Sequence, residues 1–231
     1  MRVGIICAAD REVAPFLHII EGGRVTEKAM LRFHEGRIYG IDVVVLFSGV
    51  CKVNAAIATQ ILIDRYDVQA VINVGTAGGM NKELQIFDTV ISTEVAYHDV
   101  APDILTEFHP WLKTVYFSAD ERLLKLSRQA ARKTHIEGSV YWGRMVTGEA
   151  FITDEGRERI NEQFSPLSVD METASVAHVC YVNNVPFISI RSITDTAMYR
   201  GIGCFEENSK KASSIAKDIT VALLKELHNM Q

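Results

Sequence analysis

Three carboxylates, two hydroxyls and one aromatic ring follow segments that read as buried strands. They are Glu12, Ser48, Thr76, Phe151, Glu172 and Asp195. Carboxylates can transfer protons or bind sugar hydroxyls, and an aromatic ring can stack on a flat base. In open α/β proteins, ligands bind where the ends of strands gather. We therefore expect these residues to converge on one site for a small molecule that contains a sugar and a flat base.

The segment 168–195 is the unit around which we expect the other elements to be organised. It reads as a buried strand, an apolar helical segment at 174–180, and a second buried strand that begins near Phe187 and ends on Asp195. A parallel crossover of this kind delivers the ends of both strands to one edge of a sheet. Glu172 and Asp195 are therefore predicted to face one crevice.

Two of these signals also have a purely structural interpretation. Taken alone, Glu12 is an ordinary first-turn acid that the helix dipole favours. The glycine-rich segment 75–79 is equally a plain tight turn or a place where backbone approaches a ligand. It lacks the Gly-x-Gly-x-x-Gly and Gly-Lys-Ser/Thr patterns of nucleotide sites. The convergence of six residues on one edge favours the functional interpretation.

Apolar periodicity predicts the elements that must position these residues. Strands are expected at 3–9, 31–39, 41–47, 69–74, 88–96 and 139–147, and helices at 53–66, 120–133, 154–163 and 205–228. The 231 residues are long enough for one domain with a substantial core. This alternation of strands and helices predicts an α/β fold.

Composition narrows the classes of partner. The apolar share is 48%, the charged share 23% and the net charge −5, which favours a small substrate over a nucleic acid. No apolar run reaches the length of a membrane span and residues 1–9 do not resemble a signal peptide, so we expect a cytoplasmic protein without a membrane partner.

The cysteines and histidines predict neither a disulfide framework nor a metal site. Cys7, Cys51, Cys180 and Cys204 are scattered, and the seven histidines show no metal-binding spacing. His178 lies in the apolar helical segment, which is typical of a core residue. We expect no metal and no cofactor.

Three motifs make the chain recognisable: VTGEAFI at 146–152, DMETA at 170–174 and RSITD at 191–195. With weaker matches in order along nearly the whole chain, they resemble the 5'-methylthioadenosine/S-adenosylhomocysteine nucleosidases of the purine nucleoside phosphorylase superfamily. The resemblance implies a single domain over residues 1–231, a three-layer α/β/α fold with a central mixed, largely parallel twisted sheet. It also implies hydrolysis of the N-glycosidic bond of methylthioadenosine and S-adenosylhomocysteine, which releases adenine and the 5'-thio-substituted ribose.

The same resemblance implies catalytic roles. Asp195 would protonate N7 of adenine, Glu12 would activate the attacking water, and Thr76 and Arg191 would help to position that water. Glu172 would hold the 2' and 3' hydroxyls of the ribose. Breaking this bond builds positive charge on the sugar and negative charge on the base, so an acid and a carboxylate at opposite ends match the chemistry.

Five further roles concern binding, and they too are implied by the resemblance. Met171 would pack on the ribose, Phe151 would stack on the purine, and the backbone of Ile152 would bind the adenine edge. Val50 and Phe205 would line the pocket for the 5'-thio group.

The aromatic segment 97–111 has no evident use within one subunit. In the family it completes the pocket of a second subunit. We therefore expect a symmetric homodimer in which each 97–111 loop covers the pocket of its partner.

Some positions depart from the family pattern. Asp170 stands where the family mostly has Glu, Thr76 where it has Ser, and Cys51 where it has Gly. The segment 198–200 is also unusual, and Arg200 is either a solvated charge or a partner for a carboxylate on a larger 5' group.

Three alternative functions remain open. Phosphorolysis needs cationic side chains for phosphate, and only Arg11 and Arg191 are near the predicted site, so hydrolysis is favoured. The substrate could instead be another 5'-modified adenosine, such as aminofutalosine. Retention of Glu12 and Asp195 argues against a non-catalytic binding or storage protein.

Overall fold

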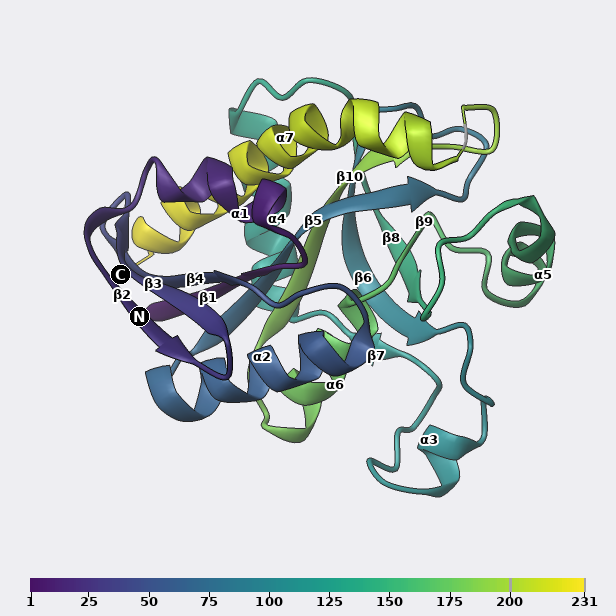
Figure 1. The fold of residues 1–231 in the computed structure, drawn as a ribbon, viewed down its shortest axis with the longest axis horizontal. Coiled ribbons are helices and arrows are strands. Elements are labelled where there is room, and N and C mark those ends of the chain that lie inside the picture. The colour runs from purple at the N-terminus through teal and green to yellow at the C-terminus, as the bar shows by residue number, and fades with distance from the viewer. Residues whose placement is uncertain (200, 231) are drawn as a thin grey trace.

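Helices cover both faces of one mixed β-sheet (Figure 1). The computed structural model describes residues 1–199 and 201–230, without the side chains at positions 154 and 155. Within this part of the chain the strands are β1 (Arg2–Cys7), β2 (Glu21–Lys28), β3 (Leu31–Ile38), β4 (Ile41–Phe47), β5 (Ala70–Gly79), β6 (Thr89–Tyr97), β7 (Phe117–Ser118), β8 (Val140–Thr147), β9 (Ser168–Asp170) and β10 (Phe187–Asp195).

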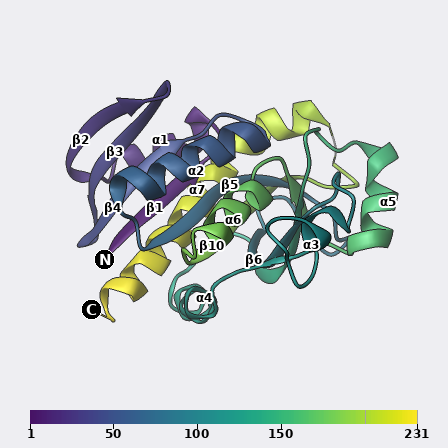
Figure 2. The same ribbon diagram turned by 90° about the horizontal axis from the view of Figure 1, so that it is seen from below.

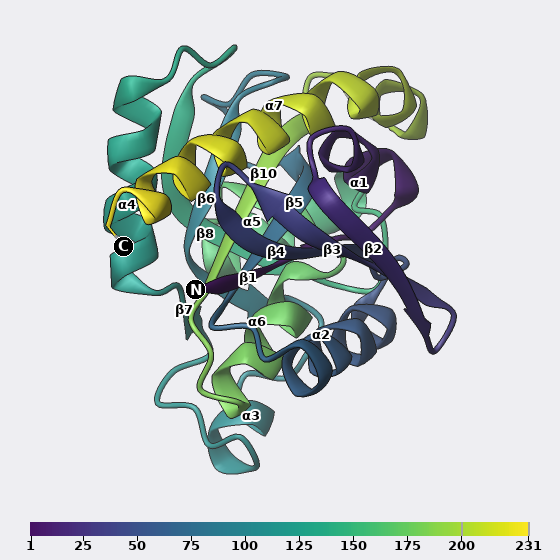
Figure 3. The same cartoon turned by 90° about the vertical axis from the view of Figure 1, so that its left-hand side faces the viewer.

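The helices lie in two outer layers. They are α1 (Asp10–Leu17), α2 (Lys52–Tyr66), α3 (Ile104–Glu107), α4 (Glu121–Lys133), α5 (Asp154–Phe164), α6 (Thr173–Val182) and α7 (Ile202–His228). Helices α1, α4 and α7 cover one face of the sheet (Figure 3). Helices α2 and α6 lie side by side on the other face (Figure 2). The expected three-layer α/β/α fold with a mixed sheet is confirmed.

Alternation along the central strands produces the two cores. Successive residues of a strand point to opposite faces, and in β1 the buried Ile5 packs under α1, α4 and α7 whereas the buried Ile6 packs under α2 and α6. A strand that is apolar at every position is therefore a strand covered on both faces. All of the expected strands and helices are present, with their ends shifted by a few residues.

The edge strand β2 has no counterpart among the expected elements. Seven of its eight residues are exposed, so the strand carries no apolar alternation that would reveal it. It pairs antiparallel with β3, which pairs antiparallel with β4.

Part of the sheet closes on itself. The strand order is β10-β6-β8-β9-β5-β1-β4-β3-β2, and β10 also pairs with β5. The predicted parallel crossover from β9 to β10 is wrong, because β9 runs antiparallel to β5 whereas β10 runs parallel to it. The two strands still meet at one point, since Gly78 of β5 pairs with Val169 of β9 on one side and with Asp195 of β10 on the other.

The predicted tight turn at 75–79 is also wrong, because β5 continues through these glycines to Gly79. Their lack of a side chain admits functional groups from neighbouring elements. A Cβ atom at Gly75 would lie 2.5 Å from Glu12 Oε1 and 2.9 Å from Arg191 Nη1, and one at Gly78 would lie 3.2 Å from Asp195 Oδ2. The two glycines leave room beside β5 for charged side chains, Gly75 on one face of the strand and Gly78 on the other.

None of the helices that the structure describes is both long enough and apolar enough to cross a membrane.

We predict that Gly75→Ala destabilises the protein by about 1–3 kcal/mol, because the added methyl group overlaps the carboxylate of Glu12. Gly203→Ala is the control, since nothing lies within 4 Å of the added Cβ in helix α7. The control should be neutral or more stable by up to about 1 kcal/mol. Urea unfolding of both variants measures the difference, and equal stabilities would contradict the prediction.

Candidate active site

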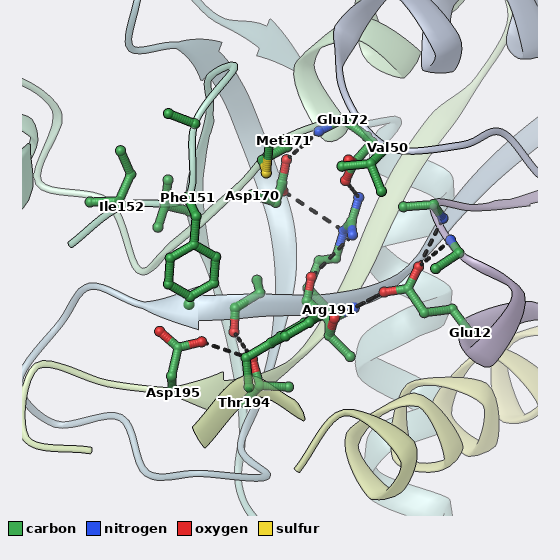
Figure 4. A pocket seen from close by; sticks show the side chains of 18 of the residues that line it. Glu12, Val50, Phe151, Ile152, Asp170, Met171, Glu172, Arg191, Thr194 and Asp195 are labelled. Carbon is green, nitrogen blue, oxygen red and sulfur yellow. Dashed lines mark hydrogen bonds and ion pairs between the residues drawn. The ribbon is translucent and has the colours of Figure 1, made fainter. Parts of the chain in front are cut away.

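One cavity lies where helix α1, the sheet and the start of helix α7 meet (Figure 4). Ten of the eleven residues that the sequence analysis assigned to the site line it: Glu12, Val50, Thr76, Phe151, Ile152, Met171, Glu172, Arg191, Asp195 and Phe205. The expectation for Ser48 is wrong, because its hydroxyl donates to the backbone carbonyls of Cys7 and Gly49 and it does not line the cavity. The expected convergence of Glu172 and Asp195 on one crevice is confirmed.

The acidic groups are separated within the cavity. Figure 4 shows Asp195 and Phe151 toward one end, Glu12 toward the other, and Met171 and Glu172 between them. A ligand that spans the cavity therefore meets a carboxyl group at each end and one along its length.

Hydrogen bonds hold Glu12 at both carboxylate oxygens. Oε2 accepts from the backbone N–H groups of Ala8 at 2.8 Å and Ala9 at 3.1 Å, and Oε1 accepts from the backbone N–H and hydroxyl of Thr76 at 2.8 and 2.9 Å. The structural interpretation of Glu12 therefore applies, since it caps the start of α1, and the same side chain also lines the cavity. Thr76 positions Glu12 directly.

Arg191 is linked to Glu12 through Thr76. The guanidinium is 1% exposed, and it donates to the carbonyl of Thr76 at 3.1 Å, the hydroxyl of Thr173 at 3.2 Å and Oδ1 of Asn73 at 2.9 Å. These bonds fix the strand β5 backbone that carries Thr76. Asn73 was not predicted as part of the site, because a lone Asn within an apolar strand carries no motif.

Two carboxylates balance the buried charge of Arg191. Glu172 Oε2 lies 3.5 Å from Arg191 Nη2, and Asp170 Oδ2 lies 3.7 Å from Arg191 Nε. The other oxygen of Glu172 accepts from the backbone N–H of Cys51 at 3.0 Å. Burial raises the pKa of Glu172 to about 7, and the charges of Asp170 and Glu12 also raise it, although Arg191 and the Cys51 N–H oppose the shift.

Asp170 is a supporting residue whose role the sequence analysis missed. Its Oδ1 accepts from the hydroxyl of Thr147 at 2.7 Å and from the backbone N–H groups of Glu172 at 3.0 Å and Thr173 at 2.9 Å. It therefore ends β9 and fixes the start of α6, where Glu172 lies. An Asp shortly before a helical segment is a capping signal that could have identified it.

Asp195 is buried at the opposite end of the cavity, with 2% of its surface exposed. It accepts a hydrogen bond from the hydroxyl of Thr194 at 2.9 Å. Burial raises the pKa of Asp195, against the opposing effects of the Thr194 hydrogen bond and the Arg157 charge. A carboxyl group with a raised pKa is suited to carry a proton to a ligand.

The apolar wall of the cavity combines Phe151 and Phe205, whose rings pack edge to face with centroids 6.1 Å apart. The guanidinium of Arg11 lies over the ring of Phe205, 5.0 Å from its centroid. Met198 and Tyr199 are exposed and do not line the cavity, and Arg200 lies outside the described residues.

Across residues 1–199 and 201–230, His, Cys, Asp and Glu side chains form no group of three or more that could bind a metal ion.

Comparison with known proteins places this geometry in context. Residues 2–225 match the sequence model of the phosphorylase superfamily. The chain is 36% identical to the 5'-methylthioadenosine/S-adenosylhomocysteine nucleosidase of Bacillus subtilis (strain 168), over 99% of this chain and 100% of that protein. The structure is similar to that of the corresponding nucleosidase of Colwellia psychrerythraea 34H in complex with adenine, with a TM-score of 0.90, 33% identity, and coverage of 98% and 96% of the two chains. It is also similar to the futalosine hydrolase of Helicobacter pylori strain 26695, with a TM-score of 0.89, 26% identity and 98% of each chain covered.

The raised pKa of Glu172 leads to a prediction about stability. Below pH 4.5, the ordinary pKa of a glutamate, the carboxyl group is neutral in both the folded and the unfolded protein. Between pH 4.5 and about 7 it ionises in the unfolded chain but stays mostly protonated in the folded protein. The wild-type protein therefore loses stability over this window, and Glu172→Gln should become more stable relative to it, with a plateau above about pH 7. Urea unfolding across this range measures the difference, and a pH-independent difference would contradict the shift.

Proposed function

Because this chain belongs to the 5'-methylthioadenosine/S-adenosylhomocysteine nucleosidase family of the phosphorylase superfamily, we propose that it hydrolyses the N-glycosidic bond of these two nucleosides. The products are adenine and the 5'-thio-substituted ribose. The observation that carries this proposal is a cavity with carboxyl groups at opposite ends and a third between them. We also propose that residues 1–231 form one catalytic domain of a cytoplasmic enzyme.

The carboxyl groups at the two ends of the cavity each carry out one proton transfer. Asp195 donates a proton to N7 of adenine, so the base leaves as a neutral molecule when the bond to the ribose C1' breaks. Glu12 accepts a proton from the water whose oxygen attacks C1'. The raised pKa of Asp195 supports the first role, and the hydrogen bonds that hold Glu12 beside Thr76 support the second.

The remaining residues bind the substrate between these groups. Glu172 accepts hydrogen bonds from the 2' and 3' hydroxyls, and Met171 packs against the ribose. Phe151 stacks on the purine, and the Ile152 backbone binds the edge of the base. Their places along the cavity support this assignment, because Glu172 and Met171 lie between the two ends and Phe151 lies near Asp195 (Figure 4).

The charge of the cavity supports water over phosphate as the nucleophile. Among the described residues, Arg11 and Arg191 are the arginines that line it, and no lysine does. Arg191 is buried and bonded to Asn73, Thr76 and Thr173, and it faces two carboxylates. A phosphate anion beside Glu12 and Glu172 would therefore meet repulsion, and the guanidinium of Arg191 is already bonded to protein acceptors and cannot offset it.

A nucleosidase for another 5'-modified adenosine, such as aminofutalosine, is the second candidate. The structural similarity to a futalosine hydrolase supports it, although the curated nucleosidase relative is more similar in sequence. Both candidates share the adenine and ribose sites and differ at the 5' group, which Val50 and Phe205 are proposed to line.

We propose a homodimer in which the 97–111 loop completes the pocket of the partner subunit. The loop carries α3 and projects from the body of the protein (Figure 1). Phe108 and Trp111 are 60% and 66% exposed, and Val53 of α2 and Tyr181 of α6 are 66% and 47% exposed. Large exposed apolar side chains on neighbouring elements are typical of a protein interface.

The purified protein should release free adenine from methylthioadenosine equally well with and without phosphate. Chromatography of the products distinguishes the functions. Release that requires phosphate would identify a phosphorylase, and the absence of release would support a binding protein.

Asp195→Asn should lower turnover by about 10²- to 10⁴-fold, the usual contribution of a positioned acid. Asparagine keeps the shape of the side chain but cannot transfer the proton, so adenine would leave as an unstabilised anion. Adenine binding should weaken much less. Near-normal turnover in the folded variant would show that Asp195 only supports the end of β10.

Trp111→Glu should convert the dimer to a monomer and reduce activity, because it places a charge in the proposed interface. Val25→Glu is the control, since Val25 is 54% exposed in β2, distant in sequence from the loop. Light scattering with an activity assay tests both variants. A fully active wild-type monomer at micromolar concentration would refute the dimer.

A further inference from the structure

Arg11 is a cation at the cavity that the proposed mechanism does not use. It lies in α1 directly before Glu12, it is exposed to solvent, and it also lines the cavity. Its guanidinium lies over the ring of Phe205, and its Nη1 donates to Ser209 Oγ at 3.3 Å. Two contacts with α7 therefore hold the side chain on the wall that Phe205 forms.

The charges around the cavity are unbalanced. The lining contains four carboxyl groups, from Glu12, Asp170, Glu172 and Asp195, against two guanidinium groups. A substrate that carries a negative charge of its own enters this cavity at an electrostatic cost unless a cation receives it. The position of that cation decides which end of the substrate can be anionic.

The two arginines differ in their capacity to bind another anion. Arg191 is 1% exposed, and all three of its nitrogens donate to protein acceptors. The guanidinium of Arg11 makes no ion pair with a carboxylate of any described residue, and the Ser209 hydroxyl is the one hydrogen-bond acceptor that it contacts among them. A guanidinium has five N–H donors, so Arg11 retains donors for a ligand.

We propose that Arg11 binds a carboxylate on the 5' substituent of the nucleoside and so makes the enzyme prefer acidic 5' groups over neutral ones of the same size. The inference rests on the proposed function and adds a specificity residue to it. Its basis is position: Phe205 is proposed to contact the 5'-thio group, and the free guanidinium lies over that ring. A substituent that extends past Phe205 reaches Arg11, where a planar carboxylate can accept two parallel hydrogen bonds.

The test uses two substrates that differ only in charge, 5'-S-(2-carboxyethyl)-5'-thioadenosine and its carboxamide, with methylthioadenosine as the reference. The measured quantity is kcat/KM for the acid divided by kcat/KM for the amide. This ratio cancels any general effect of a variant on folding or on the chemical step, because both substrates share the same adenine, ribose and linker.

In the wild-type dimer the ratio should exceed one, and it should fall as salt is added because screening weakens the exposed charge contact. Arg11→Met should lower the ratio about tenfold, the usual effect of losing a charge-assisted hydrogen bond. Arg11→Lys should retain part of the preference. Arg32→Met is the control for loss of one positive charge. Arg32 is an exposed residue of β3 that pairs with Glu27 of β2 and does not line the cavity, so its ratio should equal that of the wild type.

Each remaining outcome overturns the inference. An unchanged ratio in Arg11→Met, or equal losses for the acid and the amide, would show that Arg11 supports Phe205 without selecting the 5' group. A wild-type ratio of one or less would show the same. If the wild-type protein releases no adenine from methylthioadenosine either, the proposed function itself fails and the inference falls with it.

Discussion

A buried guanidinium is the constraint on which the rest of the site depends. A cation removed from water is unfavourable unless hydrogen bonds and opposite charges surround it. Arg191 of β10 meets this requirement through Asn73 and the carbonyl of Thr76 on β5, and through Asp170 and Glu172 at the junction of β9 and α6. Satisfying one charge therefore fixes the relative positions of the elements that carry the carboxyl groups of the cavity.

Two series of contacts connect Arg191 to the surrounding elements. One passes from Arg191 through Thr76 to Glu12, and the other passes through Glu172 to the backbone of Cys51 at the start of α2. The carboxylates are thus held before a substrate binds, which is the condition for electrostatic preorganisation. Asp195 lies apart from both sets of contacts, and burial raises its pKa.

Local patterns in the sequence were sufficient to locate the parts of the site. Apolar runs with strand or helix periodicity identify buried elements. Phe151, Glu172 and Asp195 lie at or just beyond the ends of such runs, and all three line the cavity. The motifs that resemble the nucleosidase family added Val50 and Phe205, which no periodicity identifies. Their placement in one cavity follows the expectation, whereas their individual roles stay predictions.

The sequence by itself determined the order of the buried elements and the α/β class, because apolar periodicity is a property of neighbouring residues. The three-layer arrangement followed from the resemblance to the nucleosidase family. Only the tertiary structure decided that β5 runs through Gly75, that β9 opposes β10 across Gly78, and that Arg11 rests on Phe205. Each of these depends on partners distant in the chain. The glycine run looks like a turn until Glu12 and Arg191 occupy the space that its missing side chains leave, and no local pattern encodes that space.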